Sequence, residues 1–140
     1  MARLNVDDHS LSAALDTLDM MRDLPNEMLD PILQAGAAPL LKALQFETSR
    51  LGEKHGTGGL RASLKVNRPA GKRGKRHIDI TFEGSRANPG GTSRLNSTIA
   101  FFNEFGSKRI KARHFVKRAV DTSADEVANA MADAFDHAIF

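Results

Sequence analysis

The residues of this chain with the widest chemical repertoire are its five histidines, since imidazole can bind a metal ion or move a proton. None of them stands near a second His, Asp or Glu at the spacing typical of a metal site. No nucleophile-elbow signature supports a catalytic serine, and the absence of cysteine removes thiol nucleophiles and thiolate metal sites. We therefore predict that the chain is not an enzyme and holds no metal or cofactor. The histidines are interpreted as solvated or structural: His9, His55, His77, His114 and His137.

The glycine-rich run Gly52-Glu53-Lys54-His55-Gly56-Thr57-Gly58-Gly59 resembles a phosphate-binding loop in composition. Its spacing differs from that of a P-loop, and it lies between a predicted helix and a predicted strand. Phosphate loops run in the opposite order, from strand into helix, because the helix N-terminus holds the anion. We interpret the run as a turn between two elements.

A cluster of cations within residues 72–76 is the best indication of nucleic-acid contact. It falls in a loop over residues 67–77, which we predict to be flexible, where cations at a hairpin tip could contact phosphates. No aromatic residue interleaves with these cations to stack on bases, and no recognition helix carries base-reading residues. Three interpretations stay open: non-specific DNA contact, a solvated loop, and a loop that grips an acidic neighbour. The cations are Lys72, Arg73, Lys75 and Arg76.

Charge is distributed unevenly along the chain, although the formal net charge is only +3. Residues 1–53 carry four Lys or Arg against nine Asp or Glu, residues 54–118 carry sixteen against three, and residues 119–140 carry none against five. A basic centre between acidic ends suits nucleic-acid contact. It equally suits subunits that dock a basic face on an acidic face.

The length of 140 residues favours a single domain. The first residues lack the apolar core of a signal peptide, and no run approaches the ~18 apolar residues of a membrane span. We expect no membrane contact, and the missing cysteines fit a reducing compartment.

The order of the predicted elements is helix, helix, three strands, helix. Residues 1–9 are expected to be loose, a helix follows from Ser10 or Ser12 to Pro25, and a more apolar helix ends at Gly52 after a bend or break at Gly36 and Pro39. Alternating residues predict strands over 60–66 and 77–83, and residues 84–96 read as a long flexible loop. The expected fold is α+β, with a three- to four-stranded antiparallel sheet and a C-terminal amphipathic helix packed on it.

The third strand leads into a basic segment. Residues 99–105 are apolar, β-branched and aromatic, which predicts a strand, and Gly106 with Ser107 is expected to end it. Cations then surround a single apolar anchor, Phe115. A short helical turn is predicted over 113–120, and the last helix is predicted to begin at Ser123, with Glu126 completing a capping box.

Three short motifs occur in a fixed order along the chain: Thr57-Gly58-Gly59-Leu60-Arg61-Ala62-Ser63, Glu104-Phe105-Gly106-Ser107 and Ala112-Arg113-His114-Phe115-Val116-Lys117-Arg118-Ala119. Together with the flanking helices they resemble the head–tail joining or tail-completion proteins of tailed bacteriophages. That family usually has Pro where this chain has His114, and a second common Pro is replaced by Arg118.

The resemblance implies a virion protein of the neck or tail, present in the host cytoplasm during assembly. Its expected partners are copies of itself, in a ring, and the connector, neck and tail-tube proteins. The basic segment is expected to meet an acidic face of a neighbour, such as residues 125–136. The expected interface residues are Glu104, Phe105, Gly106, Lys108, Arg109, Lys111, Arg113 and Phe115.

Overall fold

The computed structural model describes residues 24–52, 59–87, 91 and 93–139. The helix predicted between Ser10 and Pro25, and the first residues of the Thr57-Gly58 motif, lie outside this range. For the described residues the α+β class is confirmed, with helices and two small antiparallel sheets.

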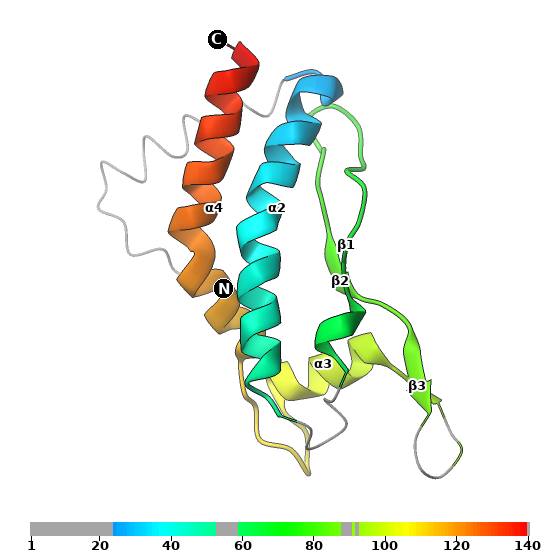
Figure 1. The fold of residues 1–140 in the computed structure, drawn as a ribbon. Coiled ribbons are helices and arrows are strands. Elements are labelled where there is room, and N and C mark those ends of the chain that lie inside the picture. The colour runs from blue at the N-terminus through cyan, green and yellow to red at the C-terminus, as the bar shows by residue number, and fades with distance from the viewer. Residues whose placement is uncertain (1–23, 53–58, 88–90, 92, 140) are drawn as a thin grey trace.

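Two long antiparallel helices, α2 over Asn26–Ser49 and α4 over Phe115–Ile139, form the main body (Figure 1). The buried apolar side chains of α2 recur at helical spacing, which gives the helix one apolar face. At Gly36 the two helices approach so closely that a Cβ atom there would lie 2.6 Å from Met131 Cγ. Glycine therefore sets the spacing of the pair at this level.

Helix α2 runs unbroken through Gly36 and Pro39, so a break at these residues is wrong. A proline within a helix costs one backbone hydrogen bond and crowds the preceding turn. Ala37 and Leu44, on either side of Pro39, are buried in the body of the protein, and this packing keeps the helix continuous. The prediction that this helix ends close to Gly52 is confirmed, since Gly52 follows the helix end with a φ of 72°.

Helix α4 begins at Phe115, so the predicted start at Ser123 and its capping box are wrong. The Ser123 hydroxyl donates to the Ala119 carbonyl oxygen at 2.7 Å, a bond made inside a helix, and Glu126 is exposed. Buried Phe115, Ala119 and Ser123 extend the stripe of Val127 and Met131 by steps of four residues. The helix therefore begins before Ser123 and Glu126, whose spacing matches that of a capping box.

The sheets are smaller than predicted. Strand β1 (Leu64–Val66) pairs with β2 (Ile80–Phe82) in the expected antiparallel hairpin, with Lys65 opposite Thr81. A 3₁₀ turn over Arg61–Ser63 replaces the first half of the predicted strand. Residues predicted as a loop instead form a second hairpin, β3 (Ser85–Ala87) with β4 (Ser93–Leu95). These strands are almost wholly exposed, so they carry no apolar pattern to detect.

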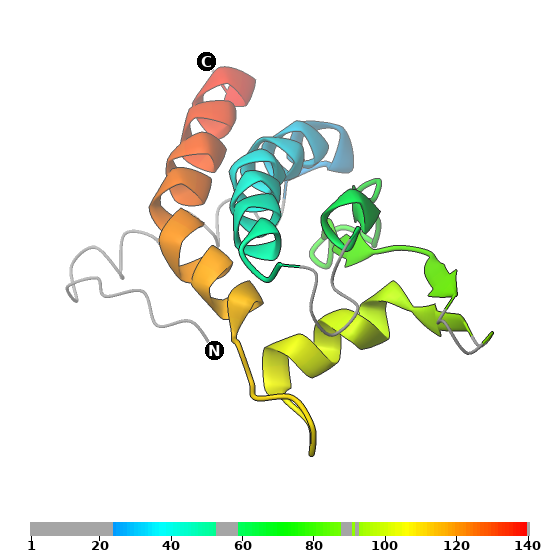
Figure 2. The same ribbon diagram turned by 60° about the horizontal axis from the view of Figure 1, so that its bottom comes forward.

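The segment predicted as a third strand is a helix, α3, over Asn96–Phe105. Its buried residues Ile99, Ala100, Asn103 and Glu104 follow a helical period and not an alternating one. The β-branched and aromatic composition misled the prediction because packing overrides a weak propensity. Helix α3 lies across the C-terminal end of α2 and the first turns of α4 (Figure 2).

Helix α4 packs mainly on α2, and not on a sheet as predicted. One apolar cluster joins the C-terminal end of α2 and the first turn of α4 to α3: Leu51, Leu60, Ile99, Ala100 and Phe115. A second cluster, around Leu29 and Ile32, joins the other end of α2 to Met131 and Phe135 of α4.

Candidate functional site

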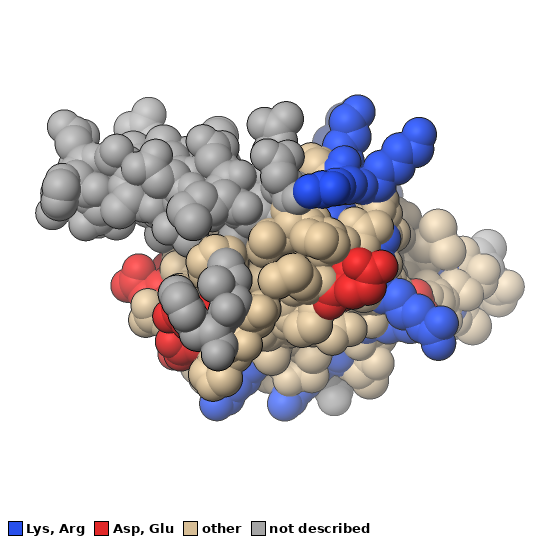
Figure 3. Space-filling model, turned by 90° about the horizontal axis from the view of Figure 1, so that it is seen from above, with Lys and Arg blue, Asp and Glu red and all other residues tan. Residues whose placement is uncertain are grey.

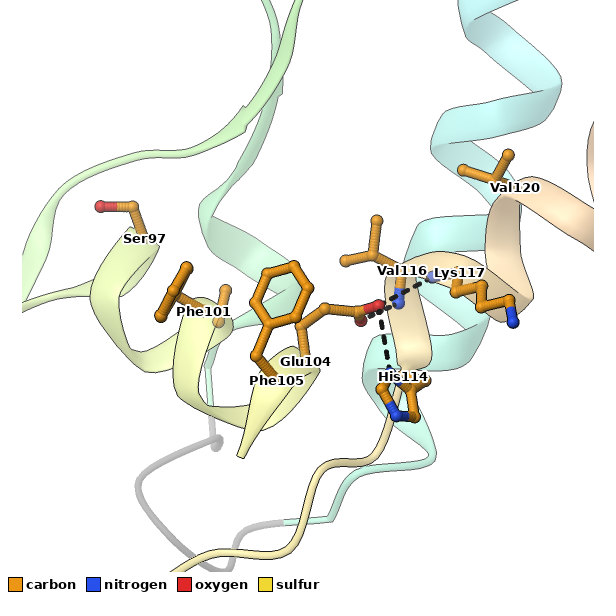
Figure 4. Close-up of a pocket in the computed structure, with 9 residues that line it drawn as sticks. Ser97, Phe101, Glu104, Phe105, His114, Val116, Lys117 and Val120 are labelled. Carbon is orange, nitrogen blue, oxygen red and sulfur yellow. Dashed lines mark hydrogen bonds and ion pairs between the residues drawn. The ribbon is translucent and has the colours of Figure 1, made fainter. Parts of the chain in front are cut away.

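An apolar groove of about 650 Å³ lies between α3 and the first turns of α4 (Figure 4). Phe101 and Phe105 of α3 form one side, with ring centroids 4.9 Å apart, and Val116 and Val120 of α4 lie on the other. These two phenylalanines are 56% and 62% exposed, which is unusual for side chains with this much apolar area. The groove is thus an apolar surface open to a partner.

Glu104 forms the floor of the groove and binds the start of α4. Its side chain points from α3 toward α4, and its two carboxylate oxygens accept the backbone N–H groups of Val116 (2.7 Å) and Lys117 (3.2 Å) (Figure 4). A helix N-terminus leaves such donors unpaired and favours a negative charge. Glu104 is buried, so it holds the groove in shape, and little of it is available to a partner.

Gly106 ends α3 with a φ of 81°, as predicted for a chain reversal although the element it ends is a helix. A Cβ atom at this position would lie 2.8 Å from the Ala112 backbone nitrogen, so only glycine fits. The next residues form a tight turn, in which the Ser107 hydroxyl accepts the backbone N–H groups of Arg109 and Ile110, both at 3.2 Å.

This turn presents cations beside the groove. Lys108, Arg109 and Lys111 are exposed, as is Lys117 at the groove itself. Arg113 is different, because its guanidinium donates to the Leu51 carbonyl oxygen at 2.8 Å and ties the turn to the end of α2. The groove therefore combines exposed aromatic rings with positive charge at its edge.

Phe115 is fully buried, with 0% exposure, and its ring lies edge-on to Phe82 at 5.9 Å. The prediction that it anchors the basic segment is confirmed. In the single chain it offers no surface to a partner, since the core around α3 encloses it.

The other basic segment forms the end of the β1–β2 hairpin. Ala70 and His77 close it with reciprocal backbone hydrogen bonds of 2.9 Å, and Lys72, Arg73 and Lys75 are exposed beyond that bridge. Arg76 instead turns inward, donating to both carboxylate oxygens of Asp30 on α2 at 2.7 Å. This hydrogen bond holds the pKa of Asp30 below its ordinary value and raises the pKa of Arg76, against an opposing effect of desolvation.

On the face of the molecule that Figure 3 shows, the Lys and Arg side chains form several separate groups, with acidic side chains between them. In the part of the chain that the structure describes, no group of His, Asp and Glu is arranged to hold a metal ion. No helix in that part is both long and apolar enough to cross a membrane.

No protein-family model, curated protein or solved structure matches this chain.

Two features of the site differ from what the sequence predicts. The composition around Phe101 predicts a strand, although its spacing of four residues from Phe105 is the signal that places both on one face of a helix. The Arg76–Asp30 pair joins residues 46 positions apart, and nothing in a single sequence indicates such a contact.

Proposed function

We propose that this chain is a structural protein of a tailed-phage virion that joins the capsid connector to the tail through contacts with neighbouring subunits, and not by catalysis. The observation that carries the proposal is the pair of exposed rings, Phe101 and Phe105, beside the exposed cations of residues 108–111. Exposed aromatic residues next to positive charge are typical of protein-binding surfaces.

Two of the motifs that resemble the joining family support the same proposal, because residues 104–107 and 112–119 form one structural unit. Glu104 caps α4, Gly106 permits the turn, and Phe115 fixes the far end of the turn in the core. The unit positions the groove and its cations, so the motif residues serve the shape of a binding surface.

The outer face of α4 offers a complementary surface. Asp125, Asp133 and Asp136 are exposed there and carry negative charge. Contact between this face in one subunit and residues 108–111 in the next would be heterologous. Repetition of such a contact gives a ring when the rotation between neighbouring subunits closes on itself.

The direct test is a joining assay with a phage that carries this gene. Deleting the gene should yield filled heads and complete tails that remain separate in the lysate, as seen by electron microscopy. Adding the purified protein to that extract should restore joined, infectious particles. Joined particles formed without the protein would contradict the proposal.

A further inference from the structure

The end of the β1–β2 hairpin is a built structure and not a loose loop. Backbone hydrogen bonds between Ala70 and His77 close its base, and the Lys75 N–H donates to the Lys72 carbonyl oxygen at 2.8 Å across its turn. Gly71 has a φ of 100°, and a Cβ atom there would collide with the Lys75 carbonyl oxygen. Glycine is therefore required for this turn.

Arg76 fastens this structure to the main body. Its guanidinium binds the Asp30 carboxylate on α2 in a bidentate pair and also donates to the Gly71 carbonyl oxygen at 2.9 Å. The hairpin consequently rises beside the first turns of α2 (Figure 1). Arg76 has this internal role, and the cations exposed at the tip are Lys72, Arg73 and Lys75.

The composition of the tip favours a polyanion over a protein as its partner. A protein interface needs an apolar or aromatic centre, and residues 68–75 expose no large apolar side chain. Among the residues that the structure describes, the exposed phenylalanines lie instead on α2 and α3. Contact with phosphate groups needs only cations held at a fixed place.

We propose that the hairpin tip binds the phosphate backbone of duplex DNA through Lys72, Arg73 and Lys75, without reading base sequence. Sequence readout would need side chains that enter a groove and pair with base edges, and the tip carries only cations, glycines and a small apolar residue. This binding is separate from the joining role, so it holds whether or not the chain joins heads to tails.

The test measures the affinity of the full chain for a fluorescent duplex of about 30 base pairs by anisotropy, over a series of salt concentrations. Each phosphate contact contributes about 0.9 to the slope of log K against log salt. The triple variant Lys72→Ala/Arg73→Ala/Lys75→Ala should lose up to about 2.7 of that slope and most of the affinity at low salt. Duplexes of unrelated sequence should bind equally well.

The matched control is Lys108→Ala/Arg109→Ala/Lys111→Ala, which removes the same charge from the turn beside the groove. It should keep the salt slope of the natural chain. Equal losses in both variants would mean attraction by net charge alone and would overturn the proposal. An unchanged salt slope in the hairpin variant would also overturn the proposal. If that variant lost particle joining while its DNA affinity stayed intact, the partner of the tip would be an acidic protein and the proposal would be wrong. Circular dichroism shows whether each variant is folded.

Discussion

The Glu104 carboxylate caps helix α4 from another helix, with Glu104 Oε2 lying 2.7 Å from the backbone nitrogen of Val116. A cap is ordinarily supplied by the residue that precedes the helix. Here that residue is His114, which has a φ of 49° and turns the chain into the helix, while its Nδ1 lies 3.9 Å from Glu104 Oε1. Capping at a distance thus joins α3 to α4 and defines the angle between the two sides of the groove.

Removing this cap should destabilise the protein. Glu104→Ala leaves two N–H groups of the first turn of α4 without their acceptor in a partly buried site, which we expect to cost about 1–3 kcal/mol of unfolding free energy. Urea denaturation followed by circular dichroism measures this loss. Glu126→Ala is the matched control, because this exposed glutamate lies within α4 and caps nothing. If both variants lost equal stability, the capping role of Glu104 would be wrong.

Continuity of α4 through Ser123 gives a second prediction. Ala124→Pro should cost about 3 kcal/mol or more, since proline inside a helix removes a hydrogen bond and clashes with the preceding turn. At the first position of a helix beginning at Ser123 the same change would be tolerated. Ala124→Gly, which loosens the backbone without a clash, should cost only about 1 kcal/mol. Thermal unfolding of both variants distinguishes a helix that begins at Phe115 from one that begins at Ser123.

How far the sequence predicted this molecule depended on whether a signal was local. The α+β class, the first hairpin and the positive φ of Gly106 all follow from short-range patterns and were correctly predicted. Helix α3 was not predicted because its β-branched and aromatic residues suit a strand, whereas its buried residues follow a helical period.

The candidate site was predicted in part, for the same reason. The basic turn after Gly106 and the buried Phe115 were visible as a charge run around one aromatic residue. The cap by Glu104 and the pairing of Arg76 with Asp30 depend on contacts between distant segments. Those contacts decide which charged residues are exposed. The sequence indicated Arg76 as a surface cation, whereas its guanidinium is paired with Asp30.

Close packing at Gly36 gives a third prediction. Gly36→Val should cost about 1–3 kcal/mol, because the new side chain must displace Met131 from a contact that leaves no room for a Cβ atom. Combined with Met131→Ala, the same change should cost less than the sum of the two single effects. Gln34→Val, at an exposed position of α2, is the control and should cost less than about 0.7 kcal/mol. Additive losses in urea denaturation would argue against the contact.

The Asp30–Arg76 pair predicts a pH-dependent loss of stability. Because the pKa of Asp30 is lowered in the folded state, its contribution is fully present above the ordinary carboxyl pKa of about 3.9 and disappears as the pH falls through the folded value. Asp30→Asn should therefore be less stable than the natural chain at neutral pH, and the difference should shrink below about pH 4. Urea midpoints across this range measure it. A difference that is constant with pH would exclude the ionic contribution.

The exposed aromatic pair predicts a separation of stability from function. The double variant Phe101→Ser/Phe105→Ser should change the unfolding free energy by less than about 0.5 kcal/mol per site, because both rings are largely exposed, yet it should abolish particle joining in the complementation assay. Phe115→Ala should instead cost about 3–5 kcal/mol through loss of the core around α3.

The control for the aromatic pair is Phe46→Ser. Phe46 is 62% exposed, as is Phe105, but it stands on α2 and does not line the groove. We expect this variant to join heads to tails normally, which would show that the position of the lost apolar area matters and not its amount. Normal joining by the double variant of the pair would mean that the groove is not the binding surface. Equal loss of joining in the double variant and in Phe46→Ser would point to a general effect of surface polarity on solubility.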